Sequence, residues 1–204
     1  MIGVQTARSA VANLAGMDMY QIKNLSLTNR HIFQKHTSRS QAEPHSQNQP
    51  QGWFEKVKTV IVTTESDYKQ LSKGRQGRLQ TASGLSARNL TQALRRNDPL
   101  VPQEFTLGVT DDVGIDGMPA LIHAALQQDY SLYRAEDDPD SRFLFVAHIP
   151  AGYVGRTIHA GSKTKLVGGL IIIVVQVVAS MPQIITVYPV DVGWANRHSG
   201  HELG

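Results

Sequence analysis

The stretch Gly168-Gly-Leu-Ile-Ile-Ile-Val-Val-Gln-Val-Val-Ala-Ser-Met-Pro-Gln-Ile-Ile-Thr-Val-Tyr-Pro-Val190 is almost wholly apolar and is dominated by Ile and Val. These β-branched side chains fit a pleated strand better than a helix because they are stiff at χ1. Turn chemistry at Ala179–Gln183 interrupts the stretch. We therefore predict two adjacent antiparallel strands, at about Leu170–Val178 and Ile184–Val190.

The second predicted strand alternates in character. Ile185, Val187 and Pro189 should face one way, and Thr186 and Tyr188 the other. A strand that is buried on one face can present a hydroxyl and a phenol on its other face. This face is our first candidate for a functional site, although ordinary sheet packing of both residues remains the alternative.

A transmembrane helix is the main rival interpretation, because no charge occurs from Leu166 to Val190. A spanning helix needs about 20 consecutive apolar residues. Five polar or turn-forming residues interrupt this stretch: Gln176, Ser180, Pro182, Gln183 and Thr186. We therefore expect strands and no stable membrane span.

The composition suits a folded domain of ordinary size. The chain has 204 residues, is 41% hydrophobic and contains no cysteine, so disulfide and thiol chemistry are excluded. Its first residues lack a basic segment followed by a long apolar one, so we expect no secretory signal there.

The net charge of +3 hides a marked asymmetry. Residues 1–97 hold 14 Lys or Arg against 5 Asp or Glu, whereas residues 98–204 hold 6 against 12. Most of the Asp and Glu residues lie in 98–140, where Arg134 is the only Lys or Arg. This polarity suggests a basic surface able to meet phosphates, although two ordinary solvated surfaces would give the same pattern.

Residue patterns along the chain predict an α+β fold, with N-terminal helices packed on a mainly antiparallel sheet that ends in a β-hairpin. Helices are expected at Ala7–Tyr20, Ser86–Arg96 and Met118–Gln128. Further strands are expected at the end of Trp53–Thr64 and at Glu104–Val109, Ser141–Ile149 and Gly155–His159.

The sequence also predicts the domain division, one loop and the state of the C-terminal tail. Residues 1–52 are expected to form a helical lead-in and a polar linker, and residues 53–204 the α+β domain. Asp111–Gly117 is expected to be an acidic loop, but it lacks the complete ligand pattern of a calcium loop. The polar tail Asp191–Gly204 is expected to be frayed.

The sequence contains no phosphate loop, dinucleotide fingerprint, nucleophile elbow or zinc-spaced Cys/His set. Eight histidines remain as candidates for acid–base chemistry. Metal-free RNA cleavage needs a base, an acid and a group that stabilises the phosphorane, and His, Arg, Lys, Thr and Tyr suit these tasks. The chain has all these residue types.

Three segments resemble the RNase A-like C-terminal toxin domains of bacterial contact-dependent growth inhibition systems, within the barnase, EndoU, colicin and RelE-like nuclease group. These segments are His31-Ile-Phe-Gln-Lys-His36, Arg78-Leu-Gln-Thr-Ala-Ser83 with the helix after it, and Val154-Gly-Arg-Thr-Ile158 with the closing strands that end in Ile184-Ile-Thr-Val-Tyr-Pro189. The resemblance implies a toxin-type ribonuclease that needs no metal or cofactor and cleaves tRNA or other cellular RNA by transesterification at the 2′-hydroxyl.

The same resemblance implies the site residues. The catalytic set would be His36 or His31 with Arg78, Thr186 and Tyr188. His159 would add an acid and Lys163 a cation, as the His, His, Lys set of EndoU-like nucleases does. Arg75 and Arg156 would help to bind the RNA.

The family also implies a biological setting. The domain would be secreted by bacteria as part of a larger protein, would act in the cytoplasm of a target cell, and would be neutralised by a cognate immunity protein.

Two other classes of function remain open. Ser131-Leu-Tyr-Arg134 resembles the opening motif of cholera-toxin-like ADP-ribosyltransferases, in which the Arg holds NAD. No Ser-Thr-Ser element follows it, and Glu202 is the only Glu after Glu136. A non-catalytic nucleic-acid-binding module that uses the basic first half is the third class.

Overall fold

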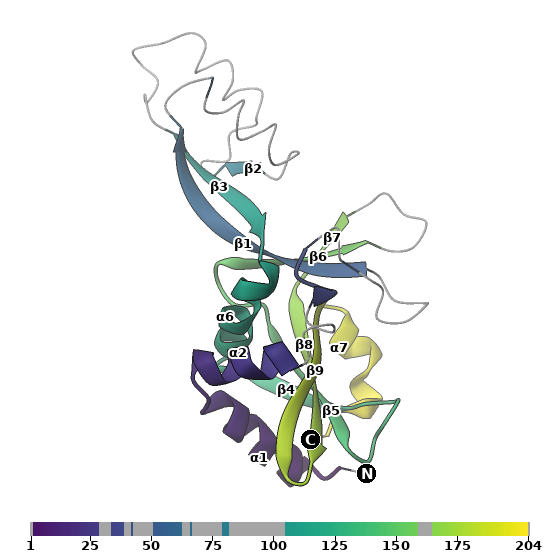
Figure 1. The fold of residues 1–204 in the computed structure, drawn as a ribbon. Helices are drawn as coiled ribbons and strands as arrows, with labels where there is room; N and C mark the ends of the chain where they lie inside the picture. Colours follow the sequence, from purple (N-terminus) through teal and green to yellow (C-terminus); the bar gives the residue numbers. More distant parts are fainter. Residues whose placement is uncertain are drawn as a thin grey trace. The chain divides into compact units, whose positions relative to one another are not determined.

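The computed structural model describes residues 2–28, 34–38, 42, 51–62, 66, 79–81, 105–158 and 165–203. The fold is α+β with two antiparallel sheets, which confirms the predicted class (Figure 1). The helices are α1 (Val4–Ala15), α2 (Met19–Thr28), α6 (Gly114–Leu126), α7 (Trp194–Arg197) and the short 3-10 helix η1 (Ser199–His201). The strands are β1 (Gln51–Val62), β2 (Leu79–Thr81), β3 (Phe105–Asp112), β4 (Tyr130–Arg134), β5 (Arg142–His148), β6 (Tyr153–Ile158), β7 (Lys165–Gly168), β8 (Leu170–Val178) and β9 (Met181–Val190).

The strands form one sheet in the order β2-β3-β1-β6-β7 and a second in the order β4-β5-β8-β9. The chain divides into two compact units, residues 1–55 with 112–204, and residues 56–111. No described helix is long and apolar enough to cross a membrane. The expected division into a helical lead-in with a polar linker, 1–52, and an α+β domain, 53–204, stays a prediction.

The described part of the unit 56–111 contains β2 and the adjoining lengths of β1 and β3. β2 pairs antiparallel with β3, and Leu79 lies opposite Val109. Lys58 Nζ lies 2.9 Å from Asp111 Oδ2, a partly exposed ion pair that adds little to stability. The helix predicted at Ser86–Arg96 lies outside the described residues.

In the larger unit, the predicted hairpin is present. β8 spans Leu170–Val178 as expected, and β9 begins at Met181, earlier than the expected start at Ile184. The turn is short because Ala179 and Ser180 both adopt left-handed backbone conformations, with φ of 48° and 67°. Two such residues give the type of turn whose twist matches that of the flanking strands.

The predicted alternation in β9 is correct for Thr186, Val187 and Tyr188 and wrong for Ile185. Val187 packs in the core beneath the helices, whereas Tyr188 belongs to the hydrophobic cluster on the opposite face. The register shifts where β9 passes from Ile184 to Thr186, so that Ile185 lies in a β-bulge. The extra residue turns Ile185 toward the cluster of Tyr188 and leaves Ile184 in the helix-covered core.

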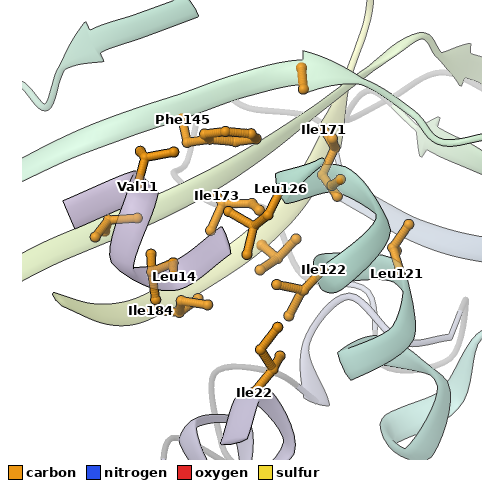
Figure 2. Packing of buried hydrophobic residues seen from close by; sticks show 14 of the residues in the cluster. Val11, Leu14, Ile22, Leu121, Ile122, Leu126, Phe145, Ile171, Ile173 and Ile184 are labelled. Atoms are coloured by element: carbon orange, nitrogen blue, oxygen red, sulfur yellow. The ribbon is translucent and has the colours of Figure 1, made fainter. Parts of the chain in front are cut away.

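The helices α1, α2 and α6 cover one face of the four-stranded sheet. In α1, buried residues recur at the spacing of one helical face, with Ala7, Ala10, Val11 and Leu14 turned inward. The first helix therefore packs in the same core as the sheet. Figure 2 shows ten labelled residues of this core: Val11, Leu14, Ile22, Leu121, Ile122, Leu126, Phe145, Ile171, Ile173 and Ile184.

The opposite face of the sheet is covered by the C-terminal segment, which corrects the expectation of a frayed tail. Trp194 of α7 is buried and packs edge-on against Tyr133, with ring centroids 5.1 Å apart. The Leu203 N–H donates to the Leu132 carbonyl at 2.8 Å. One large aromatic ring thus gives a mostly polar segment enough apolar area to order it.

The acidic segment Asp111–Gly117 is also not a loop. Asp111 and Asp112 end β3, and α6 begins at Gly114. Among the described residues, no group of three His, Asp or Glu side chains is placed to hold a metal ion.

Three glycines allow β9 to approach the neighbouring sheet closely at Pro189. A Cβ at Gly52 of β1, Gly155 of β6 or Gly168 of β7 would lie 3.0, 2.7 and 3.1 Å from side-chain atoms of Pro189. The absent side chains create the space that the pyrrolidine ring fills. Pro189 is accommodated in this position because β9 is an edge strand of its sheet.

We expect Gly155→Ala to lower the free energy of unfolding by about 1–3 kcal/mol, because its Cβ would overlap both Pro189 and Ile149. Urea denaturation measures the change. The control is Gly200→Ala, whose Cβ would meet no atom within 4 Å and should change stability by less than about 0.5 kcal/mol. Equal effects of the two substitutions would contradict the close approach.

Candidate functional site

His36 and Tyr188, which come from distant parts of the sequence, lie side by side. Their ring centroids are 5.9 Å apart and the ring planes are inclined by 45°. His36 is 3% exposed and Tyr188 is 5% exposed. His36 Nδ1 lies 2.7 Å from the carbonyl oxygen of Gly52. Because a carbonyl only accepts, Nδ1 must carry a proton, and Nε2 is the basic atom of the neutral ring.

Backbone hydrogen bonds hold His36 in this place. The Phe54 N–H donates to the His36 carbonyl at 3.0 Å, and the Gly114 N–H donates to the Thr37 carbonyl, also at 3.0 Å. The short segment that carries His36 is therefore tied to the start of β1 and to the start of α6. This anchoring also explains the contact with Tyr188. His36 bonds to Gly52, Gly52 lies close to Pro189, and Pro189 is the residue after Tyr188 in β9.

Tyr188 is a protonated phenol over a wide range of pH. Burial, and to a lesser extent the negative charge of Asp137, raises the pKa of Tyr188 well above its ordinary value of 10.0. The phenol therefore acts as a hydrogen-bonding group and does not supply a charge near neutral pH. Thr186 is buried on the same face of β9.

A pocket of about 290 Å³ lies on this face of the sheet and includes Tyr188 in its wall. Its residues come from the end of β4 and the turn that follows, from β5 and β9, and from the C-terminal helices: Tyr133, Arg134, Ala135, Glu136, Asp137, Leu144, Tyr188, Trp194, His198 and His201. Tyr188 thus touches His36 and also lines the pocket.

The two histidines of the pocket are held by different contacts. His198 stacks on Trp194 with ring centroids 4.1 Å apart, and its Nδ1 donates to the Trp194 carbonyl at 2.8 Å. His201 Nε2 lies 3.9 Å from Glu136 Oε1, and this pair is largely exposed. The centroids of the two imidazoles are 6.4 Å apart.

Charged side chains complete the edge of the pocket. Arg134 and Glu136 are exposed, and Asp137 accepts a hydrogen bond of 2.7 Å from Arg142 Nη1. Burial raises the pKa of Tyr133, and the charge of Glu202 adds to this effect. The pocket therefore combines an apolar wall, two neutral phenols, two imidazoles, a guanidinium and two carboxylates.

Arg156, a predicted RNA-binding residue, is engaged inside the protein. Its Nε donates to Glu55 Oε2 at 3.2 Å, and the buried Glu55 also accepts from Trp53 Nε1 at 3.0 Å. A role for Arg156 toward phosphate stays a prediction. Five other predicted site residues lie outside the described part of the chain: His31, Arg75, Arg78, His159 and Lys163.

A site shared by Arg134, Trp194, His198 and His201 was not predicted from the sequence. A signal was present for two of them. Leu-Tyr-Arg134 was noted as a transferase-like motif, and Trp194 is a large aromatic residue in a polar segment, which predicts burial. The two histidines follow Trp194 at helical spacing, so its burial also fixes their position.

No family model, curated protein or solved structure matches this chain. The resemblance to toxin ribonucleases therefore depends on the short motifs alone. The chemistry and geometry of the site are therefore the basis for inferring function.

The raised pKa of Tyr188 predicts a loss of stability in alkali. Because its folded pKa exceeds the unfolded value near 10, the neutral phenol stabilises the fold fully below about pH 10, and this contribution declines as the pH rises toward the folded pKa. Between pH 9 and pH 11, the wild type should lose about 1.4 kcal/mol more unfolding free energy than Tyr188→Phe. Urea denaturation at both pH values measures this difference, and equal losses would contradict it.

Proposed function

We propose that this protein is a metal-independent ribonuclease that cleaves RNA by transesterification at the 2′-hydroxyl. The observation that carries the proposal is the contact between His36 and Tyr188. Both residues belong to the set implied by the resemblance to toxin ribonucleases, and they lie far apart in the sequence. An imidazole beside a hydrogen-bonding phenol is a suitable start for acid–base chemistry on a phosphodiester.

In the proposed reaction, His36 Nε2 accepts the proton of the 2′-hydroxyl. The 2′-oxygen attacks phosphorus, a 2′,3′-cyclic phosphate forms, and the bond from phosphorus to the 5′-oxygen breaks. The 5′-oxygen receives a proton from the general acid, a role that we assign to His159. Tyr188 and Thr186 donate hydrogen bonds to the phosphoryl oxygens, and Arg78 and Lys163 attract the phosphate.

The pocket supports access of RNA to Tyr188, the member of the pair that lines it. Tyr188 lines the pocket and also contacts His36, so a nucleotide in the pocket would reach the phenol. The basic balance of residues 1–97 supports binding of the RNA backbone, which proceeds without sequence selection.

The biological setting is part of the same proposal. The motifs support a toxin effector that bacteria secrete within a larger protein, that degrades tRNA or other RNA in the cytoplasm of a target cell, and that a cognate immunity protein neutralises.

The proposal predicts RNA cleavage in the presence of EDTA. His36→Ala should slow cleavage by about 100-fold or more, the effect of losing a general base, and Tyr188→Phe should slow it by about 10-fold or more. Gel analysis of a labelled RNA measures the rates. The matched control is His148→Ala, an exposed histidine at the end of β5, which should leave the rate unchanged.

Thermal melting of each variant must accompany these assays, because His36 and Tyr188 are buried and their substitution can also destabilise the fold. Folded wild-type protein that leaves RNA intact after long incubation would refute the proposal. Equal rates for wild type and His36→Ala would refute the assigned base.

A second candidate function has one observation in its favour. Arg134, the Arg of the transferase-like Leu-Tyr-Arg motif, lines the pocket beside aromatic residues and could contact a dinucleotide such as NAD. An ADP-ribosyltransferase should transfer label from NAD to a component of a cell extract, and Arg134→Ala should abolish transfer. Absence of transfer by the wild type would eliminate this candidate.

A further inference from the structure

Of the residues that line the pocket, Tyr188 alone belongs to the proposed catalytic pair, and the proposed reaction gives the others no role. Its apolar lining includes Tyr133, Leu144 and Trp194, which pack in one hydrophobic cluster with Tyr188. Its charged lining residues, Arg134, Glu136 and Asp137, are exposed. A volume of about 290 Å³ is just below the range for small-molecule sites, roughly 300–1,000 Å³. The pocket therefore suits one flat group of the size of a nucleotide and excludes a base pair or duplex.

Two exposed residues of the pocket, Arg134 and Glu136, supply hydrogen-bond donors and hydrogen-bond acceptors within three positions of the sequence. Arg134 can only donate hydrogen bonds, whereas the carboxylate of Glu136 can only accept them. Both side chains are exposed, and Glu136 meets His201 only at 3.9 Å. Asp137 is engaged with Arg142 at 2.7 Å, so Glu136 is the carboxylate with the greater capacity to accept from a ligand.

This arrangement does not favour a bare phosphate. A phosphate would gain from Arg134 but would be repelled by Glu136 and Asp137. A better ligand is a planar group that presents donors to a carboxylate and acceptors to a guanidinium. Bases of single-stranded RNA have this character, because proteins read their edges by hydrogen bonds and stack their faces on aromatic or His rings.

Guanine matches both groups at once. Its N1–H and N2–H₂ form two adjacent donors that fit one carboxylate, and its O6 and N7 form two acceptors that fit a guanidinium. Adenine, cytosine and uracil lack the pair of adjacent donors. We propose that the pocket is a recognition subsite for an unstacked guanine base, with Glu136 accepting from N1–H and N2–H₂ and Arg134 donating to O6 and N7.

The face of the base would lie against the apolar wall near Tyr188. The inference takes its RNA setting from the proposed ribonuclease function, and it adds a preference for cleavage beside guanosine. Base binding itself can be measured without cleavage.

Isothermal titration calorimetry of the full chain with 3′-GMP, 3′-AMP, 3′-CMP and 3′-UMP tests the subsite. We expect 3′-GMP to bind at least about tenfold more tightly than the others, the discrimination that one bidentate contact provides. Guanosine, which lacks the phosphate, should also bind more tightly than the other three nucleosides, and inorganic phosphate should bind weakly. Equal affinity for the four nucleotides, or binding of phosphate as tight as that of 3′-GMP, would overturn the proposal.

Two substitutions locate the contacts. Glu136→Gln and Arg134→Gln should each weaken 3′-GMP binding by about tenfold or more and leave 3′-CMP binding nearly unchanged. The matched controls are Asp116→Asn on α6 and Arg8→Gln on α1, which make the same changes of charge on helices that cover the other face of the sheet. Controls that weaken 3′-GMP binding as much as the pocket variants would overturn the assignment.

Cleavage assays separate this inference from the proposed function. Selective 3′-GMP binding by a protein that leaves RNA intact would refute the ribonuclease and retain the subsite. RNA cleavage that shows no preference for guanosine and no change in KM on Glu136→Gln would refute the subsite and retain the ribonuclease. If both hold, Glu136→Gln should raise KM for guanosine sites with little change in kcat.

Discussion

The packing of Pro189 against three glycines is the constraint on which the candidate site depends. Gly52, Gly155 and Gly168 belong to three different strands, and a Cβ on any of them would press against the proline. Their bare backbone lets β9 approach this sheet closely, and the carbonyl of Gly52 receives the imidazole of His36. The residue before Pro189 is Tyr188. One close approach between backbones thus positions both members of the proposed catalytic pair.

The two faces of the four-stranded sheet have different roles: one forms most of the hydrophobic core, and the other carries the candidate site. The face toward α1, α2 and α6 is filled by aliphatic and aromatic side chains, as Figure 2 shows, and forms most of the buried core. The other face carries Thr186, Tyr188 and Tyr133 and is covered by the segment around Trp194. Phenols are suited to this face because the ring adds buried apolar area while the hydroxyl remains able to form hydrogen bonds. A substitution on this face can therefore alter the site without removing the main core.

Local patterns in the sequence explain which features could be predicted. β8 and the class of the fold follow from β-branched composition and turn chemistry, which act over a few residues. The bulge at Ile185 could not be predicted, because a strict period of two contains no information on an inserted residue. The C-terminal tail is ordered because Trp194 is buried, and the mostly polar neighbours of this residue hide that signal in the sequence. The contact between His36 and Tyr188 is tertiary, so motifs could only suggest it.

The distribution of charge limits what the pocket can do alone. Among the described residues that line the pocket, the carboxylates of Glu136 and Asp137 oppose one guanidinium, that of Arg134, and Arg142 is paired with Asp137. Tyr188 adds no charge, because burial keeps its phenol protonated. A polyanion would therefore gain little from this pocket, whereas an uncharged base with donors and acceptors would gain from both signs of charge. The positive excess that RNA backbone binding requires is in residues 1–97. We therefore assign recognition of the base to the pocket and attraction of the phosphates to residues 1–97.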